Sequence, residues 1–216
     1  MSMSTGRIPR DRLIGLMKVY FVTDPRLFRP RTVEETCRDV LTAGVRTIQL
    51  RDKETPPGGL LQIARRLGSL CLDFDALFIV NDDPETALRA GAHGVHVGQG
   101  DAPAAEARAI IGPDLILGVS VRTPWEAAQA EGAGADYVAA NGVFATPTKT
   151  DLDTPLGLEG LGRIRAATSL PLVAIGGIGS ENADAVLSAG ADCLAGVRMC
   201  LDTELIRRFA PGRGRD

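Results

Sequence analysis

Short polar clusters follow five apolar runs of this 216-residue chain, and their residue types suit the binding of phosphates and a divalent cation. Lysine and arginine neutralise phosphate charge, carboxylates and amide oxygens are ligands for Mg²⁺, and glycine lets backbone N–H groups approach an anion. The clusters cover residues 49–53, 81–82, 99–101, 146–149 and 176–177. If the apolar runs are parallel strands of a barrel, their carboxyl ends meet on one face, and we expect a single site there.

The aspartates of two clusters could hold a metal ion. Asp82 and Asp101 each end one of two consecutive predicted strands, and each has an amide beside it, Asn81 and Gln99. Two carboxylates that reach one point, completed by waters and phosphate oxygens, are a common way to hold Mg²⁺. The alternative for each aspartate is to cap the next helix. That alternative suits Asp101 better than Asp82, because Asp83 lies closer to the helix start.

Gln49, Arg51 and Lys53 alternate along the end of one predicted strand, so their side chains share a face. The two cations suit a phosphate, and the Gln49 amide could recognise the donor and acceptor edge of a heterocycle. The alternative is that Arg51 forms a structural ion pair with Asp52 or another neighbour. Ser120 ends a later strand and adds a hydroxyl to the same mouth.

Two further clusters suit an oxyanion. Thr146, Thr148 and Lys149 supply two hydroxyl donors and an ammonium after the sixth predicted strand, although a polar turn with a solvated lysine is the alternative. Gly176 and Gly177 follow the seventh predicted strand and lead toward a helix, where backbone N–H groups and the helix dipole favour phosphate. A pair of glycines by itself is equally consistent with a tight turn.

The residues that usually supply nucleophilic catalysis do not form a recognisable set. His96 lies in the middle of a predicted strand, and we interpret it as a satisfied core histidine, because no carboxylate pattern marks it as a base. The four cysteines form no C-x-x-C pair, which predicts buried, reduced thiols. We therefore expect a site that acts by electrostatics and positioning.

The elements that position these residues alternate strictly between strand and helix, which predicts α/β architecture with a parallel sheet and helices outside it. The strands are expected at residues 19–23, 47–51, 77–80, 94–97, 115–121, 137–140, 172–175 and 193–197. The helices are expected at residues 33–43, 60–71, 84–90, 104–111, 124–131, 158–167, 182–188 and 204–209. A helix-ending phrase with glycine recurs at Gly44, Gly91, Gly134 and Gly190. Eight pairs predict a single (β/α)₈ TIM barrel.

Composition limits the classes of partner. The net charge is −3, aromatic residues make up 4% and no stripe of Lys and Arg occurs, so we expect no nucleic-acid partner. No apolar stretch approaches transmembrane length, so we expect no membrane, and with reduced cysteines we expect a cytoplasmic protein. Residues 1–17 are expected to form a flexible N-terminal extension, residues 18–209 the TIM-barrel catalytic domain, and residues 210–216 a flexible tail.

Taken together, these motifs resemble the thiamine phosphate synthase family in order and spacing, over about residues 17–200. The matching segments are residues 20–24 (YFVTD), Gln49-x-Arg51-x-Lys53, Asn81-Asp82, residues 94–101 with Gln99-x-Asp101, residues 118–120 (GVS), residues 143–149 with Thr146-x-Thr148-Lys149, and residues 174–178 (AIGGI). The resemblance implies a TIM barrel that joins hydroxymethylpyrimidine diphosphate to hydroxyethylthiazole phosphate. The products would be thiamine phosphate and pyrophosphate.

The resemblance also implies roles for single residues. The pyrimidine diphosphate would be held by Gln49, Arg51, Lys53, Asn81, Ser120 and Lys149, with Arg51, Lys53 and Lys149 catalytic. Mg²⁺ would be bound by Asp82 and Asp101. The thiazole phosphate would be held by Thr146, Thr148, Gly177, Val197 and Arg198. In the implied dissociative mechanism pyrophosphate leaves before the thiazole nitrogen attacks, which needs cations more than a general base.

The chain departs from the family pattern at three places. Asp83 stands where the family usually has arginine, Asn141-Gly142 replaces Gly-Pro, and Arg198 replaces serine. Competing interpretations are a thiazole tautomerase on the same barrel, a non-catalytic barrel that binds thiamine precursors, and a sugar-phosphate epimerase. The aspartate pair and the second lysine argue against a tautomerase, which needs neither. The expected partners are small-molecule substrates, and the sequence leaves a homo-oligomer open.

Overall fold

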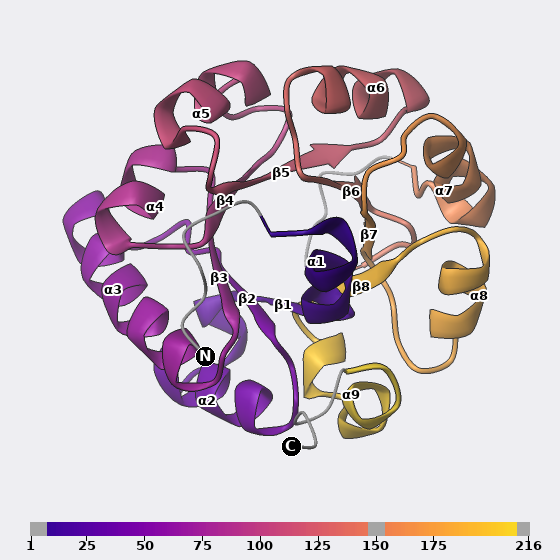
Figure 1. The fold of residues 1–216 in the computed structure, drawn as a ribbon. Coiled ribbons are helices and arrows are strands. Elements are labelled where there is room, and N and C mark those ends of the chain that lie inside the picture. The colour runs from indigo at the N-terminus through magenta and orange to yellow at the C-terminus, as the bar shows by residue number, and fades with distance from the viewer. Residues whose placement is uncertain (1–7, 147–153, 211–216) are drawn as a thin grey trace.

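Eight parallel strands close into a barrel in the computed structural model, which describes residues 8–146 and 154–210 (Figure 1). The strands are hydrogen-bonded in chain order, and β8 pairs with β1. They are β1 (Val19–Val22), β2 (Thr47–Leu50), β3 (Leu77–Asn81), β4 (Gly94–Val97), β5 (Ile116–Val121), β6 (Tyr137–Asn141), β7 (Leu172–Ile175) and β8 (Cys193–Gly196). The barrel confirms the predicted fold class, and each predicted strand boundary lies within one residue of the observed one.

Helices lie around the barrel and connect its strands, except that the first precedes β1 and lies over the barrel centre and the last follows β8 (Figure 1). They are α1 (Arg10–Met17), α2 (Val33–Thr42), α3 (Pro57–Asp73), α4 (Pro84–Ala90), α5 (Ala104–Ile111), α6 (Pro124–Gly132), α7 (Gly157–Ala166), α8 (Ala183–Ser188) and α9 (Thr203–Phe209), with short 3₁₀ helices η1 (Pro25–Leu27) and η2 (Met199–Leu201). The recurring glycines 44, 91, 134 and 190 all have positive φ, from 67° to 119°, as the helix-ending phrase predicted.

The strands bury both of their faces, and so two apolar cores form. The outer core lies between strands and helices, with Val, Leu, Ile and Ala throughout. The inner core fills the barrel and includes Tyr20, Leu77, Ile116, Tyr137 and Val173. Because these large side chains occupy the interior toward the amino ends of the strands, open space remains at the carboxyl ends, where the polar clusters lie.

Helix α1 corrects the expectation of a flexible extension for its own residues, 10–17, while residues 1–7 lie outside the described part of the chain. Figure 1 looks along the barrel and shows α1 over its centre. Leu13 and Met17 of α1 are buried and belong to the inner core. This helix was hard to predict, because an eight-residue helix with only two core positions has a weak apolar period.

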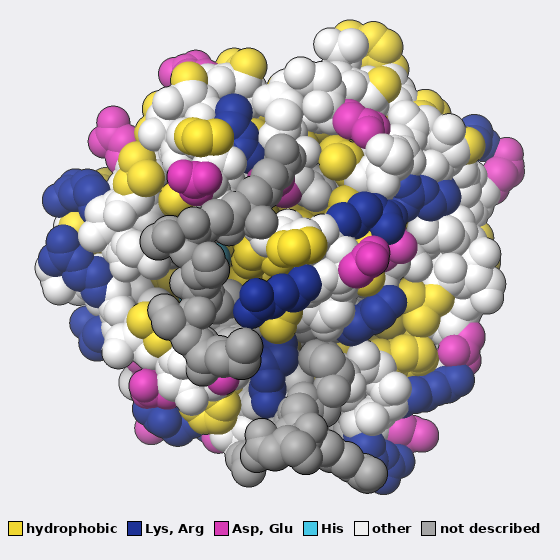
Figure 2. Space-filling view, viewed as in Figure 1, with side chains coloured by type: hydrophobic (Ala, Val, Ile, Leu, Met, Phe, Trp, Pro, Cys, Tyr) yellow, Lys and Arg dark blue, Asp and Glu magenta, His cyan; other side chains and the backbone are white. Residues whose placement is uncertain are grey.

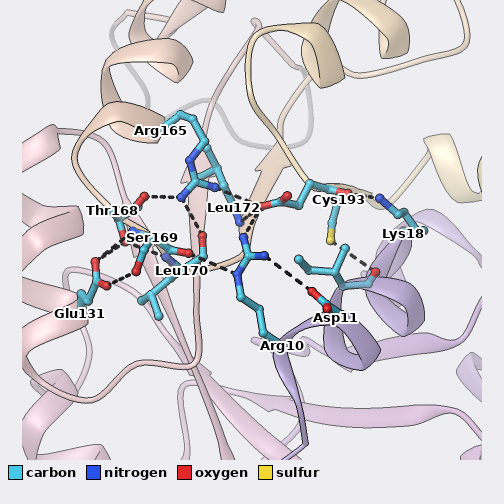
Figure 3. Close-up of polar contacts among 12 residues, drawn as sticks. Arg10, Asp11, Lys18, Glu131, Arg165, Thr168, Ser169, Leu170, Leu172 and Cys193 are labelled. Carbon is cyan, nitrogen blue, oxygen red and sulfur yellow. Dashed lines mark hydrogen bonds and ion pairs between the residues drawn. The ribbon is translucent and has the colours of Figure 1, made fainter.

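Polar contacts fix α1 to the amino ends of β7 and β8 (Figure 3). Arg10 donates to the carbonyl oxygen of Ser169 at 3.3 Å and approaches the Asp192 carboxylate at 3.8 Å. Lys18 donates to the Asp192 carbonyl oxygen at 3.0 Å, and Arg165 pairs with the Asp192 carboxylate at 3.0 Å. Lys and Arg side chains accordingly gather near the middle of this face (Figure 2). The amino end of the barrel is therefore covered by α1.

Over the described ranges, no helix combines the length and the apolar character that crossing a bilayer requires. Cys37, Cys71 and Cys193 are buried free thiols. Burial raises the pKa of Cys71 and of Cys193 to about 12, so both remain protonated thiols at neutral pH, and the predicted burial is confirmed for these three of the four cysteines.

Candidate active site

Two adjoining cavities open at the carboxyl ends of the strands. The first, here called the polar cavity, has a volume of about 450 Å³ and is lined by residues from β1 to β8 that include Gln49, Arg51, Lys53, Asn81, Asp82, His96, Asp101 and Ser120. The second, here called the glycine-lined cavity, has a volume of about 360 Å³ and is lined by residues that include Thr146, Gly176, Gly177, Glu181, Val197 and Arg198. The two share a wall made by Val22, Arg51, Asn141, Ile175 and Ala195. The sequence-predicted site residues within the described chain all line one cavity or the other.

Arg51 lies in the shared wall and is held from below by β1 and the loop after it. Its backbone N–H donates to the Thr23 hydroxyl at 2.9 Å, and that hydroxyl donates to the Arg51 carbonyl oxygen at 3.0 Å. The Asp24 carboxylate, which is buried, lies 3.8 Å from the Arg51 guanidinium. Asp24 also accepts two hydrogen bonds from the Arg26 side chain, which lowers the pKa of Asp24 in spite of burial. The neighbour that pairs with Arg51 is thus Asp24.

Asp82 and Asp83 have separate tasks. Asp83 is the N-cap of α4 and accepts from the Thr86 N–H at 3.0 Å. Asp82 has φ of 68°, in the left-handed region that few residues other than glycine adopt. This turn aims the Asp82 carboxylate into the polar cavity, where it pairs with the Lys53 ammonium and is hydrogen-bonded to Asp101.

Asp101 does not cap α5, which begins after Pro103 without a side-chain cap. Its carboxylate instead accepts from the Gly98 N–H at 2.7 Å and meets Asp82. Burial raises the pKa of Asp82, and the hydrogen bond to Asp101 raises it further against the opposing effect of Lys53. Burial alone would also raise the pKa of Asp101, but hydrogen bonds from Asp82 and Gly98, with the charge of Lys53, lower it.

The aspartate pair has the chemistry that a divalent cation requires. Two carboxylates in contact repel one another when both are ionised, and a cation between them removes that repulsion. Among the residues that the structure describes, no group of three or more His, Cys, Asp and Glu side chains could hold a metal. Asp82 and Asp101 could therefore hold Mg²⁺ only if water or phosphate oxygens supplied the remaining ligands.

A chain of hydrogen bonds crosses the floor of the polar cavity from β2 to β5. The Gln49 side-chain N–H donates to the Tyr20 hydroxyl at 2.7 Å, and the hydroxyls of Tyr20 and Tyr137 lie 2.9 Å apart. The His96 ring lies 2.9 Å from the Tyr137 hydroxyl through Nδ1 and 2.9 Å from Ser120 Oγ through Nε2. His96 is buried and satisfied, as predicted, but it is also part of the cavity floor.

The glycine-lined cavity depends on close approach of the loops after β6 and β7. Gly177 has φ of 63°, and a Cβ there would lie 2.7 Å from the Ala145 carbonyl oxygen. Helix α8 begins at Ala183, within one residue of the predicted start, so Gly177 precedes the helix and does not lie in its first turn. Arg198 is exposed at the rim, just before η2. Thr148 and Lys149 lie outside the described residues.

Sequence reasoning missed four polar side chains of the cavity walls: Tyr20, Arg122, Asn141 and Glu181. Arg122 donates to the Asn141 carbonyl oxygen at 2.8 Å and to the Thr154 carbonyl oxygen at 2.6 Å. Position relative to strand ends could have indicated Arg122 and Asn141, since each directly follows or ends a strand. Tyr20 carried no signal of its own, because apolar residues flank it on a strand buried on both faces.

Comparison with known proteins gives consistent matches. A family model described as thiamine monophosphate synthase matches residues 19–200. A thiamine-phosphate synthase of Moorella thermoacetica is 47% identical over 174 residues, which cover 81% of this chain and 83% of that protein. A thiamine-phosphate synthase of Methanoculleus marisnigri is 46% identical over 177 residues, covering 82% and 84%. The structure of a thiamine phosphate pyrophosphorylase from Pyrococcus furiosus superposes with a TM-score of 0.82 at 37% identity, covering 92% and 97% of the two chains.

Proposed function

Because the chain belongs to the thiamine monophosphate synthase family and acts as a thiamine-phosphate synthase, a transferase, we propose that its two cavities bind the two substrates separately. The observation that carries this proposal is the shared wall, through which two cavities of different lining meet. The polar cavity suits hydroxymethylpyrimidine diphosphate, and the glycine-lined cavity suits hydroxyethylthiazole phosphate. A bond formed across the shared wall would join the two halves of thiamine phosphate.

The pyrimidine diphosphate would lie with its ring over the cavity floor and its diphosphate toward the rim. Gln49 and Ser120 line the floor and offer amide and hydroxyl groups to the ring. Lys53, Arg51 and Asn81 stand at the strand ends, where the diphosphate would be. Lys149, by resemblance to the family, would join them as a third cation.

The reaction requires departure of pyrophosphate, and the residues of the rim are suited to stabilise it. Arg51 and Lys53 would neutralise charge that develops on the leaving oxygens, in positions fixed beforehand by Thr23, Asp24 and Asp82. Mg²⁺ bound by Asp82 and Asp101 would add a Lewis acid beside the diphosphate. The thiazole nitrogen, held in the neighbouring cavity, would then bond to the methylene carbon whose C–O bond to pyrophosphate has broken.

The thiazole phosphate would lie against the loops after β6, β7 and β8. Thr146, Thr148, Gly177 and the residues Val197 and Arg198 would contact its phosphate. Backbone at Gly177 can approach an oxyanion closely because no side chain intervenes. The guanidinium of Arg198 is exposed at this rim and can offer a charged donor.

The test of separate binding is a pair of matched variants in the condensation assay, with both substrates, Mg²⁺ and detection of thiamine phosphate. Asn81→Ala alters only the polar cavity and should raise KM for the pyrimidine diphosphate alone. Thr146→Ala alters only the glycine-lined cavity and should raise KM for the thiazole phosphate alone. Each effect should be several-fold, as for loss of about one hydrogen bond. A variant that raises both KM values equally would refute the assignment.

A further inference from the structure

The hydrogen-bond chain beneath the polar cavity has both of its ends exposed to ligand. Gln49, Tyr20, His96 and Ser120 all line the cavity, whereas Tyr137 between them is 0% exposed and does not line it. A ligand in the cavity could therefore contact both ends of this hydrogen-bond chain, at Gln49 and Ser120, but not the Tyr137 hydroxyl that connects them. Such a chain can determine what each end offers, since every hydrogen bond in it fixes the direction of the next.

The imidazole is the point at which direction matters. A neutral histidine carries its hydrogen on one nitrogen and accepts on the other. If the hydrogen is on Nε2, His96 donates to Ser120 Oγ, and the Ser120 hydroxyl donates its own hydrogen into the cavity. If the hydrogen is on Nδ1, Ser120 must donate to His96 and can present only lone pairs to the ligand. The two tautomers thus select ligands of opposite polarity at Ser120.

The Gln49 end of the hydrogen-bond chain favours the tautomer with hydrogen on Nε2 of His96. The Gln49 side-chain N–H can only donate, and it donates to the Tyr20 hydroxyl. When each following group accepts one hydrogen bond and donates the next, the bonds strengthen one another. That sequence runs from Tyr20 to Tyr137, from Tyr137 to Nδ1 of His96, and from Nε2 to Ser120.

Packing holds Tyr137 in the position that a hydrogen bond from its hydroxyl to Nδ1 of His96 requires. Its ring is stacked on His96, with centroids 5.5 Å apart, and meets the edge of Tyr20 at 6.1 Å. Room for the ring is made by Gly118 on β5, where a Cβ would lie 2.1 Å from Tyr137 Cζ. Burial raises the pKa of both Tyr20 and Tyr137, which keeps both phenols neutral and able to donate.

We propose that Tyr137 is a positioning residue for the synthase reaction, which donates to Nδ1 of His96 and so makes the Ser120 hydroxyl a hydrogen-bond donor toward a ring nitrogen of the pyrimidine substrate. The Gln49 carbonyl oxygen, at the other end, is then the acceptor for the exocyclic amine of the same ring. This assignment rests on the proposed placement of the pyrimidine in the polar cavity. It adds a role for two residues, Tyr137 and His96, that do not supply charge to the diphosphate.

The first test is spectroscopic and needs neither substrate nor turnover. The chain contains only two histidines, so long-range ¹H–¹⁵N spectra of the whole protein are simple, and His96→Gln identifies the His96 signals. We expect wild-type His96 with hydrogen on Nε2 and an unprotonated Nδ1, and we expect Tyr137→Phe to shift His96 toward the other tautomer. A wild-type ring with hydrogen on Nδ1, or on both nitrogens, would overturn the proposal.

The second test is a double-mutant cycle in the condensation assay. Tyr137→Phe keeps the ring contacts and removes one hydroxyl, and it should raise KM for the pyrimidine diphosphate about fivefold, the effect of roughly one hydrogen bond, with KM for the thiazole phosphate unchanged. In a Ser120→Ala background the same change should have less than about a twofold effect, because Tyr137 acts through Ser120. An equal effect of Tyr137→Phe on KM in the wild-type and Ser120→Ala backgrounds would show that Tyr137 does not act through Ser120. Absence of condensation by the wild-type protein would instead refute the proposed function and leave the spectroscopic result standing.

Discussion

Asp82 and Asp83 are neighbours in the chain and yet serve a cavity and a helix cap respectively. This pair allows a matched test of the metal assignment. Asp82→Asn keeps a residue that tolerates positive φ but removes the charge, and it should lower kcat by on the order of 10²-fold or more. Asp83→Asn should leave kcat unchanged, because asparagine is also a good N-cap. Removal of divalent metal with EDTA should abolish pyrophosphate release, and full activity in EDTA would disprove the metal site.

Asp24 gives a prediction on pH. Hydrogen bonds from Arg26 lower its pKa in the folded state, so its ionised form stabilises the fold above the unfolded pKa, and this contribution is lost as pH falls through the folded pKa. We expect Asp24→Asn to lower the free energy of unfolding most at neutral pH. The difference from wild type should shrink below about pH 4, the ordinary range of aspartate. Denaturant unfolding at several pH values measures this, and a difference that grows in acid would contradict it.

Arg198 lines the glycine-lined cavity and is one of the positions at which the sequence was expected to depart from the family pattern. If its guanidinium reaches the thiazole phosphate, Arg198→Ser should raise KM for that substrate roughly tenfold, about 1.4 kcal/mol, with KM for the pyrimidine diphosphate unchanged. Arg208, which pairs with Asp184 on α8, is a suitable control, and Arg208→Ser should change neither KM value. A kinetically silent Arg198→Ser would show that only backbone at this position serves the site.

At the scale of elements, α1 ties the inner core to the amino end of the barrel. Leu13 is 2% exposed and packs among inner-core residues, so Leu13→Ala should lower the free energy of unfolding by about 2–4 kcal/mol through the cavity it leaves. Leu72 on α3 is 62% exposed, and Leu72→Ala should cost less than about 0.5 kcal/mol. Denaturant unfolding compares the two. Equal effects would show that α1 does not contribute to the core.

The sequence predicted the alternating elements well because strands and helices of a parallel barrel are separated by strong local signals. Proline at the first turn of α4 and α6, and glycine after α2 and α4, mark the ends of helices almost to the residue. The faces of the strands could not be predicted in the same way. A strand buried on both sides has no polar alternation, so nothing indicated that Tyr20 and Tyr137 both turn into the barrel interior.

Some residues of the site could also be predicted from the sequence, and others could not. Charged residues at strand ends, such as Lys53 and Asp82, were identified because their type and position agree with the geometry of a barrel. A residue whose side chain binds backbone carbonyl oxygens of other segments was not identified. Arg122 is the clearest case, since the carbonyl oxygens that it binds, at Asn141 and Thr154, become its neighbours only when β5, β6 and the loop before α7 are assembled.

The whole molecule should respond to ligand, because strands from all parts of the chain line the polar cavity. A ligand that binds only the assembled barrel stabilises it by mass action, by about 2.7 kcal/mol at 100 times its Kd. For a chain of this size, pyrophosphate with Mg²⁺ should therefore raise the melting temperature by about 5–10 °C. Differential scanning calorimetry tests this. In Asp82→Asn the increase caused by adding Mg²⁺ to pyrophosphate should disappear, and an undiminished increase would place the metal elsewhere.

Helix α1 covers the amino end of the barrel, and this has a consequence for how ligands enter and leave. Over the described residues, Leu13 and Met17 of α1 pack onto the inner core at the amino end, and the two cavities open at the carboxyl ends of the strands. Both substrates would enter, and both products would leave, through this same opening. Product release then affects each turnover, because a pyrophosphate that stays bound at the rim blocks the entry of the next substrates.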